Sequence, residues 1–345
     1  MENTIIHWCH STVNPVMGCD GCELWKPAAA IPAILLDLLP GLTSSPREVV
    51  QKLLTQVLAS RTMSEVYRER KKIAAKLAEE WELNPKARDQ IVDVIRRECK
   101  CYAGLLGTKR AGNPGNVEAF ESPKLFPGRM AAAAKWGAPT AKETAAKPWL
   151  AGLPRLVFIS DMGDALSKCV SFEYLEREII ENVSSAKGRR HIWLWLTKRP
   201  GRMAEFGQWL ASRGASWPDN LMAMTTVTAQ SKASRIAELR KVPSKFKGLS
   251  IEPLFEPVTL DLTGIDWVIC GGGSDVLAEP FHVEWALDIH AQCKASGAAF
   301  FLKQLGKNPY YNGRRIELED KHGGDWREWP QKWRVREFPQ KFTIK

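Results

Sequence analysis

The stretch "RHIWLWLTKRPGRMAEFGQWLASRG" (residues 190–214) joins an apolar run to a helical pattern. The run at 190–197 is rich in β-branched and aromatic residues and lacks strict alternation, which is typical of a strand buried on both faces. The segment 200–214 has the spacing of a helix. Because strand-then-helix repetition builds parallel sheets with right-handed crossovers, this stretch predicts an α/β fold.

Six further runs have the same character, and helical patterns at 171–186 and 282–297 lie between them. The runs are "TIIHWC" (4–9), "RLVFIS" (155–160), "NLMAMTT" (220–226), "KGLSI" (247–251), "DWVICG" (266–271) and "AAFFLK" (298–303). Seven such strands favour a full or partial TIM-like (β/α) barrel. A doubly wound sheet stays open as the alternative, since these patterns do not give strand order.

The interval 45–98 differs from the rest of the chain because it is helical throughout. Ser45 and Pro46 resemble the start of a capped helix, and Asn84 with Pro85 resembles a second start. We therefore expect a single domain over 1–345 with a helical insertion at 45–98 and a basic, Trp-rich extension at 305–345.

Composition limits the class of protein. No run of eighteen apolar residues occurs, which argues against a membrane span, and the N-terminus lacks a secretory leader, so a cytoplasmic location is expected. The formal net charge of +10 is compatible with nucleic acid or nucleotides as partners, and equally with a surface that is merely soluble.

Two close cysteine pairs flank the helical interval, Cys19-x-x-Cys22 and Cys99-x-Cys101. A tight turn in the first pair can bring two thiolates onto one metal or cluster. A helical hairpin between the pairs would return the chain to its starting point. Four thiolates suit a structural zinc ion, whereas three suit an iron–sulfur cluster with one open iron; the position after the first strand favours the cluster.

Seven segments together resemble a phage-associated, radical-SAM-like family, the three-Cys-motif phage proteins, whose activity is largely unassigned. They are "STVNPVMGCDGC", "CYAG", "VFISDMGDALS", "LWLTKRPGRM", "GLSIEPLFEPVTL", "DWVICGGGSD" and "FFLKQLG". The resemblance implies a partial TIM-like barrel of the radical-SAM type, a [4Fe-4S] cluster and S-adenosylmethionine. It also suggests a protein partner encoded nearby.

The resemblance assigns the cluster ligands incompletely. Cys19 matches the first cysteine of the family pattern and Cys101 the last, before Tyr-Ala. The middle ligand is Cys22 or Cys99, and we favour Cys22 because its spacing and flanking glycine suit a cluster loop. Cys99 is then a spare thiol.

Polar residues follow the second and third apolar runs, where a barrel would gather them. Ser160 and Asp161 follow the second run, and the resemblance makes Asp161 the contact for the methionine amino group. A helix N-cap is the alternative role for Asp161. Thr197, Lys198 and Arg199 follow the third run, and the two cations suit the S-adenosylmethionine carboxylate or a substrate phosphate.

The later runs supply a second polar set. Ser250 and Glu252 follow one strand, and Glu252 is expected to accept from ribose hydroxyls or to pair with Lys198 or Arg199. A glycine turn lets the backbone approach S-adenosylmethionine or substrate, and the last strand adds two polar side chains. These further candidates are Gly271, Gly272, Gly273, Ser274, Lys303 and Gln304.

The tail 322–338 interleaves three tryptophans with arginines. Such a pattern is typical of single-stranded nucleic-acid binding, and equally of a segment that closes the open end of a barrel.

The leading interpretation is a radical S-adenosylmethionine enzyme that modifies or repairs a nucleic acid or nucleotide. The alternative is a non-catalytic zinc- or cluster-stabilised module that binds nucleic acid or a partner. A phosphoester hydrolase ranks last, because His191 and His290 fall within predicted elements rather than at strand ends.

Overall fold

The computed structural model describes residues 2–38, 47–58, 60–113, 115–275 and 278–342. The chain divides into two compact units. Unit 1 consists of Met1–Pro15 and Leu125–Lys345, and unit 2 of Val16–Lys124. The expected helix start at residues 45 and 46 lies outside the described residues.

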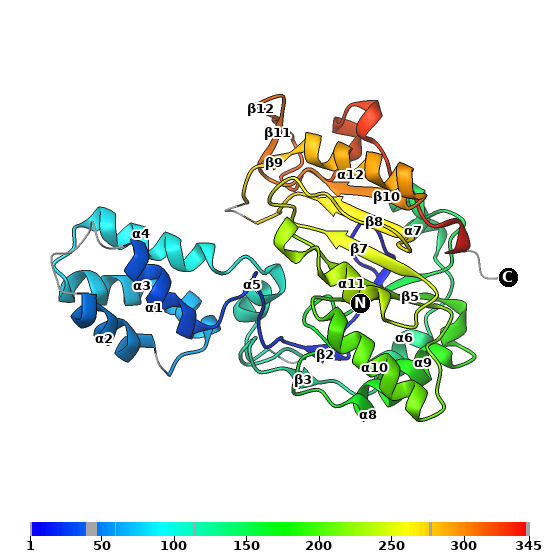
Figure 1. Ribbon diagram of the computed structural model, residues 1–345, viewed down its shortest axis with the longest axis horizontal. Coiled ribbons are helices and arrows are strands. Elements are labelled where there is room, and N and C mark those ends of the chain that lie inside the picture. The colour runs from blue at the N-terminus through cyan, green and yellow to red at the C-terminus, as the bar shows by residue number, and fades with distance from the viewer. Residues whose placement is uncertain (1, 39–46, 59, 114, 276–277, 343–345) are drawn as a thin grey trace. The chain divides into compact units, whose positions relative to one another are not determined.

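Unit 1 is built on a curled, all-parallel sheet of seven strands (Figure 1). In order across the sheet they are β1 (Ser11–Val13), β4 (Leu156–Ile159), β5 (Ile192–Thr197), β6 (Leu221–Thr226), β7 (Lys247–Ile251), β8 (Trp267–Gly271) and β10 (Ala299–Gln304). Because neighbours follow chain order without reversal, the sheet is not doubly wound. It forms a half-barrel, so every strand presents its carboxyl end at the same edge.

Helices flank this sheet. They are α6 (Arg129–Ala134), α7 (Ala141–Ala146), α8 (Phe172–Leu175), α9 (Glu181–Ser184), α10 (Pro200–Ser212), α11 (Arg235–Arg240) and α12 (Val283–Ser296). A π-helical turn at Glu176–Ile180 joins α8 to α9, so the helix expected at 171–186 is confirmed. The helices expected at 200–214 and 282–297 are α10 and α12. A small sheet contains β9 (Phe281–His282), β11 (Pro309–Tyr311) and β12 (Arg314–Arg315).

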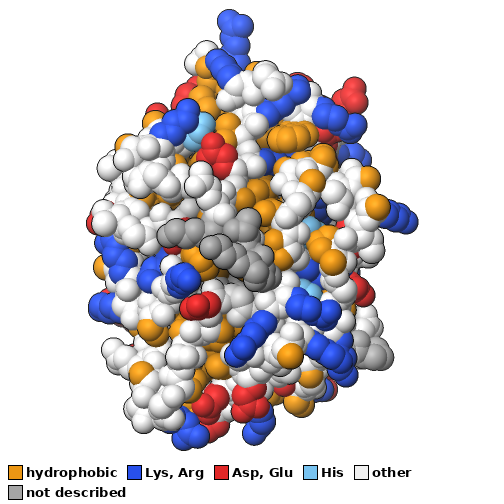
Figure 2. All heavy atoms as spheres, turned by 90° about the vertical axis from the view of Figure 1, so that its right-hand side faces the viewer, with side chains coloured by type: hydrophobic (Ala, Val, Ile, Leu, Met, Phe, Trp, Pro, Cys, Tyr) orange, Lys and Arg blue, Asp and Glu red, His pale blue; other side chains and the backbone are white. Residues whose placement is uncertain are grey.

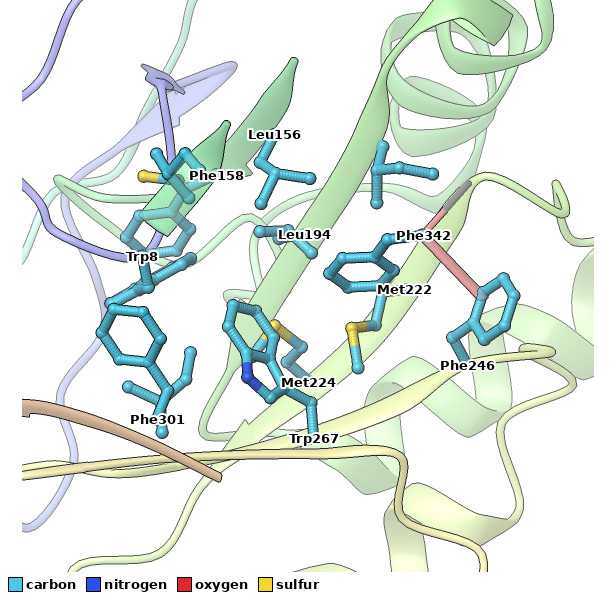
Figure 3. Packing of buried hydrophobic residues seen from close by; sticks show 14 residues of the cluster. Trp8, Leu156, Phe158, Leu194, Met222, Met224, Phe246, Trp267, Phe301 and Phe342 are labelled. Carbon is cyan, nitrogen blue, oxygen red and sulfur yellow. The ribbon is translucent and has the colours of Figure 1, made fainter. Parts of the chain in front are cut away.

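Aromatic and aliphatic side chains fill the concave side of the sheet (Figure 3). The ring of Trp8 lies 4.7 Å from that of Phe158 and 6.2 Å from that of Trp267. Met222 and Met224 of β6 belong to the same fully buried cluster. The runs expected to be buried on both faces are therefore confirmed for β4 to β8 and β10, where each overlaps one strand.

The run at 4–9 is not a strand, so this prediction is wrong; the first strand is Ser11–Val13. The ammonium group of Lys147 donates to the carbonyls of Thr4 (2.6 Å), Ile6 (2.6 Å) and Cys9 (2.7 Å). The segment is curled because three of its carbonyls point at one ammonium group. In an extended strand these carbonyls could not all reach it. The sequence pattern carries no sign of Lys147, which lies about 140 residues away.

The C-terminal tail covers the outer side of β10. The amide of Leu302 donates to Val335 O (2.8 Å), and the amide of Glu337 donates to Phe300 O (2.9 Å). These bonds use backbone groups that an edge strand would otherwise expose.

Unit 2 is mainly helical. It contains β2 (Val16–Met17), α1 (Ile31–Leu38), α2 (Arg47–Leu58), α3 (Met63–Glu80), α4 (Pro85–Arg97) and α5 (Tyr102–Lys109), and the chain leaves it through β3 (Lys124–Leu125). Asn84 caps α4 by accepting from Ala87 N (2.9 Å), with Pro85 in the first turn, as expected. Thr62 and Glu65 form a capping box at the start of α3. The segment expected to be helical, 45–98, contains α2, α3 and α4.

Membrane-spanning helices were sought across the described ranges, and none of the helices there combines the length and the apolar composition that spanning requires.

Candidate functional site

The two cysteine segments of unit 2 lie side by side, as their spacing suggested. The amide of Leu24 donates to Cys22 Sγ (3.4 Å), while its carbonyl accepts from Lys100 N (2.9 Å) and Cys101 N (2.8 Å). Trp25 forms backbone bridges with both Cys22 and Cys99. A single two-residue segment therefore brings together thiols that are about eighty residues apart in the chain.

Burial distinguishes the cysteines. Cys22 and Cys101 are partly exposed, whereas Cys19 and Cys99 are buried. Burial, with the charges of Glu121 and Glu98, raises the pKa of Cys99 well above its usual range. Of the two candidates for the middle ligand, Cys22 is the one that is partly exposed.

A metal-binding arrangement of three or more His, Cys, Asp or Glu side chains is not found among the described residues.

Trp25 is the structural centre of this cysteine region. Its indole N–H donates to Glu121 (2.6 Å), which also accepts from the amide and the hydroxyl of Ser64 (2.8 Å each). A Cβ at Gly104 would lie 2.5 Å from the indole ring, so only glycine fits behind it in "CYAG". The hydrogen bonds of Trp25, Glu121 and Ser64 therefore hold the cysteine segments in place.

In unit 1 the predicted polar residues gather at the carboxyl edge of the sheet, as parallel strands require. Asp164 organises the ends of β4 and β5. Its carboxylate accepts from Thr197 Oγ1 (2.9 and 3.0 Å), Lys198 N (3.3 Å) and Arg199 Nη1 (2.9 Å). It also accepts from Leu166 N (3.0 Å). Asp164 follows the predicted Asp161, and the sequence interpretation gave it no role of its own.

Ser160 and Asp161 begin the turn after β4. Ser160 has a φ of 75°, a left-handed backbone conformation that residues other than glycine rarely adopt. Such residues concentrate at functional sites, where the surroundings hold the strained conformation. Asp161 is not the cap of the next helix, because Ser171 caps α8 by accepting from Tyr174 N (3.3 Å).

The carboxylate of Glu252 pairs with Lys303, and Arg199 pairs with Asp164. The sequence interpretation did not pair Lys303 with Glu252, and this β10 cation is the one that the structure places against the carboxylate. The expected pairing of Glu252 with Lys198 or Arg199 stays a prediction. Both ion pairs lie at the carboxyl edge, at strands on opposite sides of β6. The side chain of Ser250 is buried at the end of β7.

The glycine turn after β8 packs against the end of β10. A Cβ at Gly272 would lie 2.4 Å from Leu305 O, which explains the absence of a side chain there. Gln304 Nε2 donates to Gly272 O (2.9 Å), and Lys307 N donates to Gly273 O (2.9 Å). Much of the hydrogen-bonding capacity of Gly271–Gly273 is thus used inside the fold, while Ser274 is partly exposed.

The tryptophans of the tail are structural. Trp329 and Trp333 are buried, and Trp326 packs 5.1 Å from Trp149. Arg336 lies between aromatic rings, 3.9 Å from Trp149 and 4.8 Å from Trp326, and burial lowers its pKa to about 9. Of the two interpretations of the tail, these contacts favour the structural one, and the segment covers the edge strand β10 rather than the open end of a barrel.

Sequence reasoning missed Leu24, Trp25 and Asn14. Asn14 Oδ1 accepts from Met162 N (2.7 Å) and so connects the end of β1 to the turn after β4. Its place in "NP" directly after a strand was the available signal. Leu24 acts through its backbone, which no sequence pattern reveals.

The fold and this edge define an α/β half-barrel protein with a helical, cysteine-bearing second unit. A family model described as a protein of unknown function (DUF5131) matches residues 93–330, more than half of the chain, so the chain belongs to this family. The matched range includes Cys99, Cys101 and the strands from β4 to β10. No curated protein and no solved structure matches the chain.

Proposed function

We propose that this protein is a radical S-adenosylmethionine enzyme with a [4Fe-4S] cluster, acting on a nucleic acid or nucleotide. The observation that carries the proposal is the convergence of the two cysteine segments on Leu24. Thiolates are soft ligands that suit iron–sulfur clusters. A cluster would take Cys19, Cys22 and Cys101, with Cys99 as the buried spare thiol.

The half-barrel supports the same proposal. Its seven parallel strands follow one another in chain order, and barrel enzymes build their sites at the carboxyl edge. Cys19 follows the end of β1 by six residues, and only the two-residue strand β2 lies between the first strand and the cysteine segment. The radical-SAM type of barrel is part of the proposal.

When bound and reduced by an external one-electron donor, the cluster would supply the electron that cleaves the sulfonium C–S bond of S-adenosylmethionine, which would release methionine and a 5′-deoxyadenosyl radical able to take hydrogen from the substrate. The chain's own residues would bind and orient. Asp161 would accept from the methionine amino group, and Lys198 would bind a carboxylate or phosphate. Asp164 would hold the Thr197–Arg199 segment in place, and the Glu252–Lys303 pair would border the substrate side.

The test is anaerobic reconstitution with iron and sulfide, followed by iron analysis, EPR spectra and an assay for 5′-deoxyadenosine. We expect about four irons per chain and reductive cleavage of S-adenosylmethionine. Cys19→Ala, Cys22→Ala and Cys101→Ala should each abolish both. Cys99→Ala should retain them.

Cys169→Ala provides the matched control, because Cys169 is an exposed thiol of unit 1. If Cys99→Ala lost iron and Cys22→Ala did not, the middle ligand would be Cys99 rather than Cys22. One zinc ion per chain, no cluster spectrum and no cleavage would refute the enzyme and leave the zinc-stabilised binding module.

A further inference from the structure

A cationic turn lies at the amino ends of the strands, opposite to the edge used in the proposed function. The 3-10 turn η4 (Gly188–Arg190) connects α9 to β5. Lys187, Arg189 and Arg190 are all exposed on it, and in the described ranges none of the three takes part in an ion pair. Figure 2 shows the side of the molecule that the amino ends of the strands face, over which Lys and Arg side chains are widely spread.

The turn is fixed rather than loose. A Cβ at Gly188 would lie 2.0 Å from Asn182 O, so only glycine fits there. The carbonyl of Gly188 accepts from Trp193 Nε1 (2.9 Å) and Asn220 Nδ2 (3.1 Å). Trp193 of β5 and Asn220, which precedes β6, therefore hold the backbone of the turn in place, and binding a ligand need not order it. The Arg190 guanidinium is itself oriented, because it donates to Lys187 O (3.2 Å) and Trp136 O (3.4 Å).

A hollow lies on each side of the turn. One, of about 560 Å³, is lined by Arg189 and Lys245 together with the hydroxyl residues Ser184 and Ser216. The other, of about 390 Å³, is lined by Arg190. Asp219 also lines this hollow, and its carboxylate lies 3.8 Å from Lys245 Nζ, a long ion pair that neutralises the cation weakly. The Lys245 ammonium also lies 5.8 Å from the centre of the Phe246 ring. Arginine forks and nearby hydroxyls are the donors that phosphate oxygens accept from.

We propose that this turn and its two hollows bind the phosphodiester backbone of single-stranded nucleic acid. Cations distributed over a ridge between two hollows match a chain of repeating phosphates better than one compact anion. The site lies at the opposite ends of the strands from the proposed catalytic edge. It does not depend on the proposed chemistry, because binding needs neither iron nor S-adenosylmethionine.

The test is fluorescence anisotropy with a labelled 20-nucleotide single-stranded DNA and the full chain, over a range of salt concentrations. We expect R189A/R190A to weaken binding about tenfold near 0.1 M salt. The slope of log affinity against log salt should fall by about 1.4, since each phosphate contact on a single strand contributes about 0.7. Lys245→Ala should lower the slope by about half as much.

R314A/R315A is the matched control, because Arg314 and Arg315 are another adjacent, exposed arginine pair of unit 1. It removes the same charge and should change affinity less than twofold. Equal losses in both double variants, an unchanged salt slope, or no binding by the wild-type chain at 0.05 M salt would overturn the proposal. Circular dichroism verifies folding of each variant, and Lys245→Ala tests the site separately.

Discussion

Two carboxylate–guanidinium pairs lie at opposite edges of the same sheet, one at the amino ends of the strands and one at the carboxyl ends, and they have different roles. At the amino ends, Arg155 pairs with Glu143 (2.8 Å) and also donates to Gly137 O (2.7 Å), Ala138 O (3.2 Å) and Ser11 Oγ (2.8 Å). Its donors are consumed in joining separate segments of unit 1. No N–H group of Arg155 remains to bind a ligand, so the pair stabilises the fold.

At the carboxyl ends, Asp164 pairs with Arg199 (2.9 Å) and fixes the segment that carries Thr197 and Lys198. The two pairs differ in which partner is more exposed: the Arg199 side chain is 16% accessible against 1% for Arg155, whereas Asp164 is 8% accessible against 13% for Glu143. The same chemistry therefore stabilises the fold at one end and positions candidate ligand-binding groups at the other. Three variants test the difference, from the largest expected effect to the smallest.

Arg155→Met should lower the free energy of unfolding by about 3–5 kcal/mol, because it leaves the Glu143 carboxylate without its partner in a mostly buried site. Urea denaturation followed by tryptophan fluorescence measures this. Adding Glu143→Gln to Arg155→Met should recover part of the loss, because it removes the unpaired charge. A decrease of less than about 1 kcal/mol in the free energy of unfolding would show that the Arg155–Glu143 pair does not stabilise the fold appreciably.

Asp164→Asn should cost about 2 kcal/mol, since the amide keeps its size but loses the charge that Arg199 and the donors around it require. If the proposed function holds, it should also weaken S-adenosylmethionine binding at least tenfold, as measured by equilibrium dialysis.

The matched control for this variant is Asp266→Asn. Asp266 accepts from Lys247 N (2.8 Å) at the amino end of β7, away from the proposed site. It should lower stability and leave S-adenosylmethionine binding unchanged. Equal effects of the two variants on binding would contradict the difference between the two ends.

His10 makes the amino end sensitive to acid. Burial, with the charges of Arg155 and Lys147, lowers the pKa of His10 to about 4. Its Nδ1 accepts from Leu156 N (3.0 Å), and this bond needs the neutral ring. Because the folded pKa lies below the unfolded value near 6.5, the contribution is complete above pH 6.5 and is lost as pH falls towards 4.

We therefore expect wild type to lose about 2 kcal/mol more stability than His10→Asn between pH 8 and pH 5. The Asn side chain can still accept from Leu156 N and does not titrate. Urea denaturation at the two pH values measures the difference. Parallel losses in the two proteins would show that His10 does not contribute to the pH dependence.

Local patterns in the sequence predicted a large part of the fold. The runs at 190–197, 220–226 and 247–251 were identified as buried strands because apolar, β-branched composition is a property of consecutive residues. The cap at Asn84 could be predicted for the same reason, since its partner Ala87 is three residues away. The adjacency of the cysteine segments could be expected because the chain between them is helical and can return to its starting point.

Other features depended on contacts between residues far apart in the chain. Lys147 turns residues 4–9 away from a strand, and the pairing of Lys303 with Glu252 joins β10 to the end of β7. The role of Asp164 depends on β4 and β5 lying side by side, because the donors Thr197, Lys198 and Arg199 stand at the end of β5. Which charges meet is set by register and packing, and a linear pattern contains neither. By itself, then, the sequence determined the strand–helix repeat and the two polar sets that follow the strands, whereas the tertiary structure alone decided their partners.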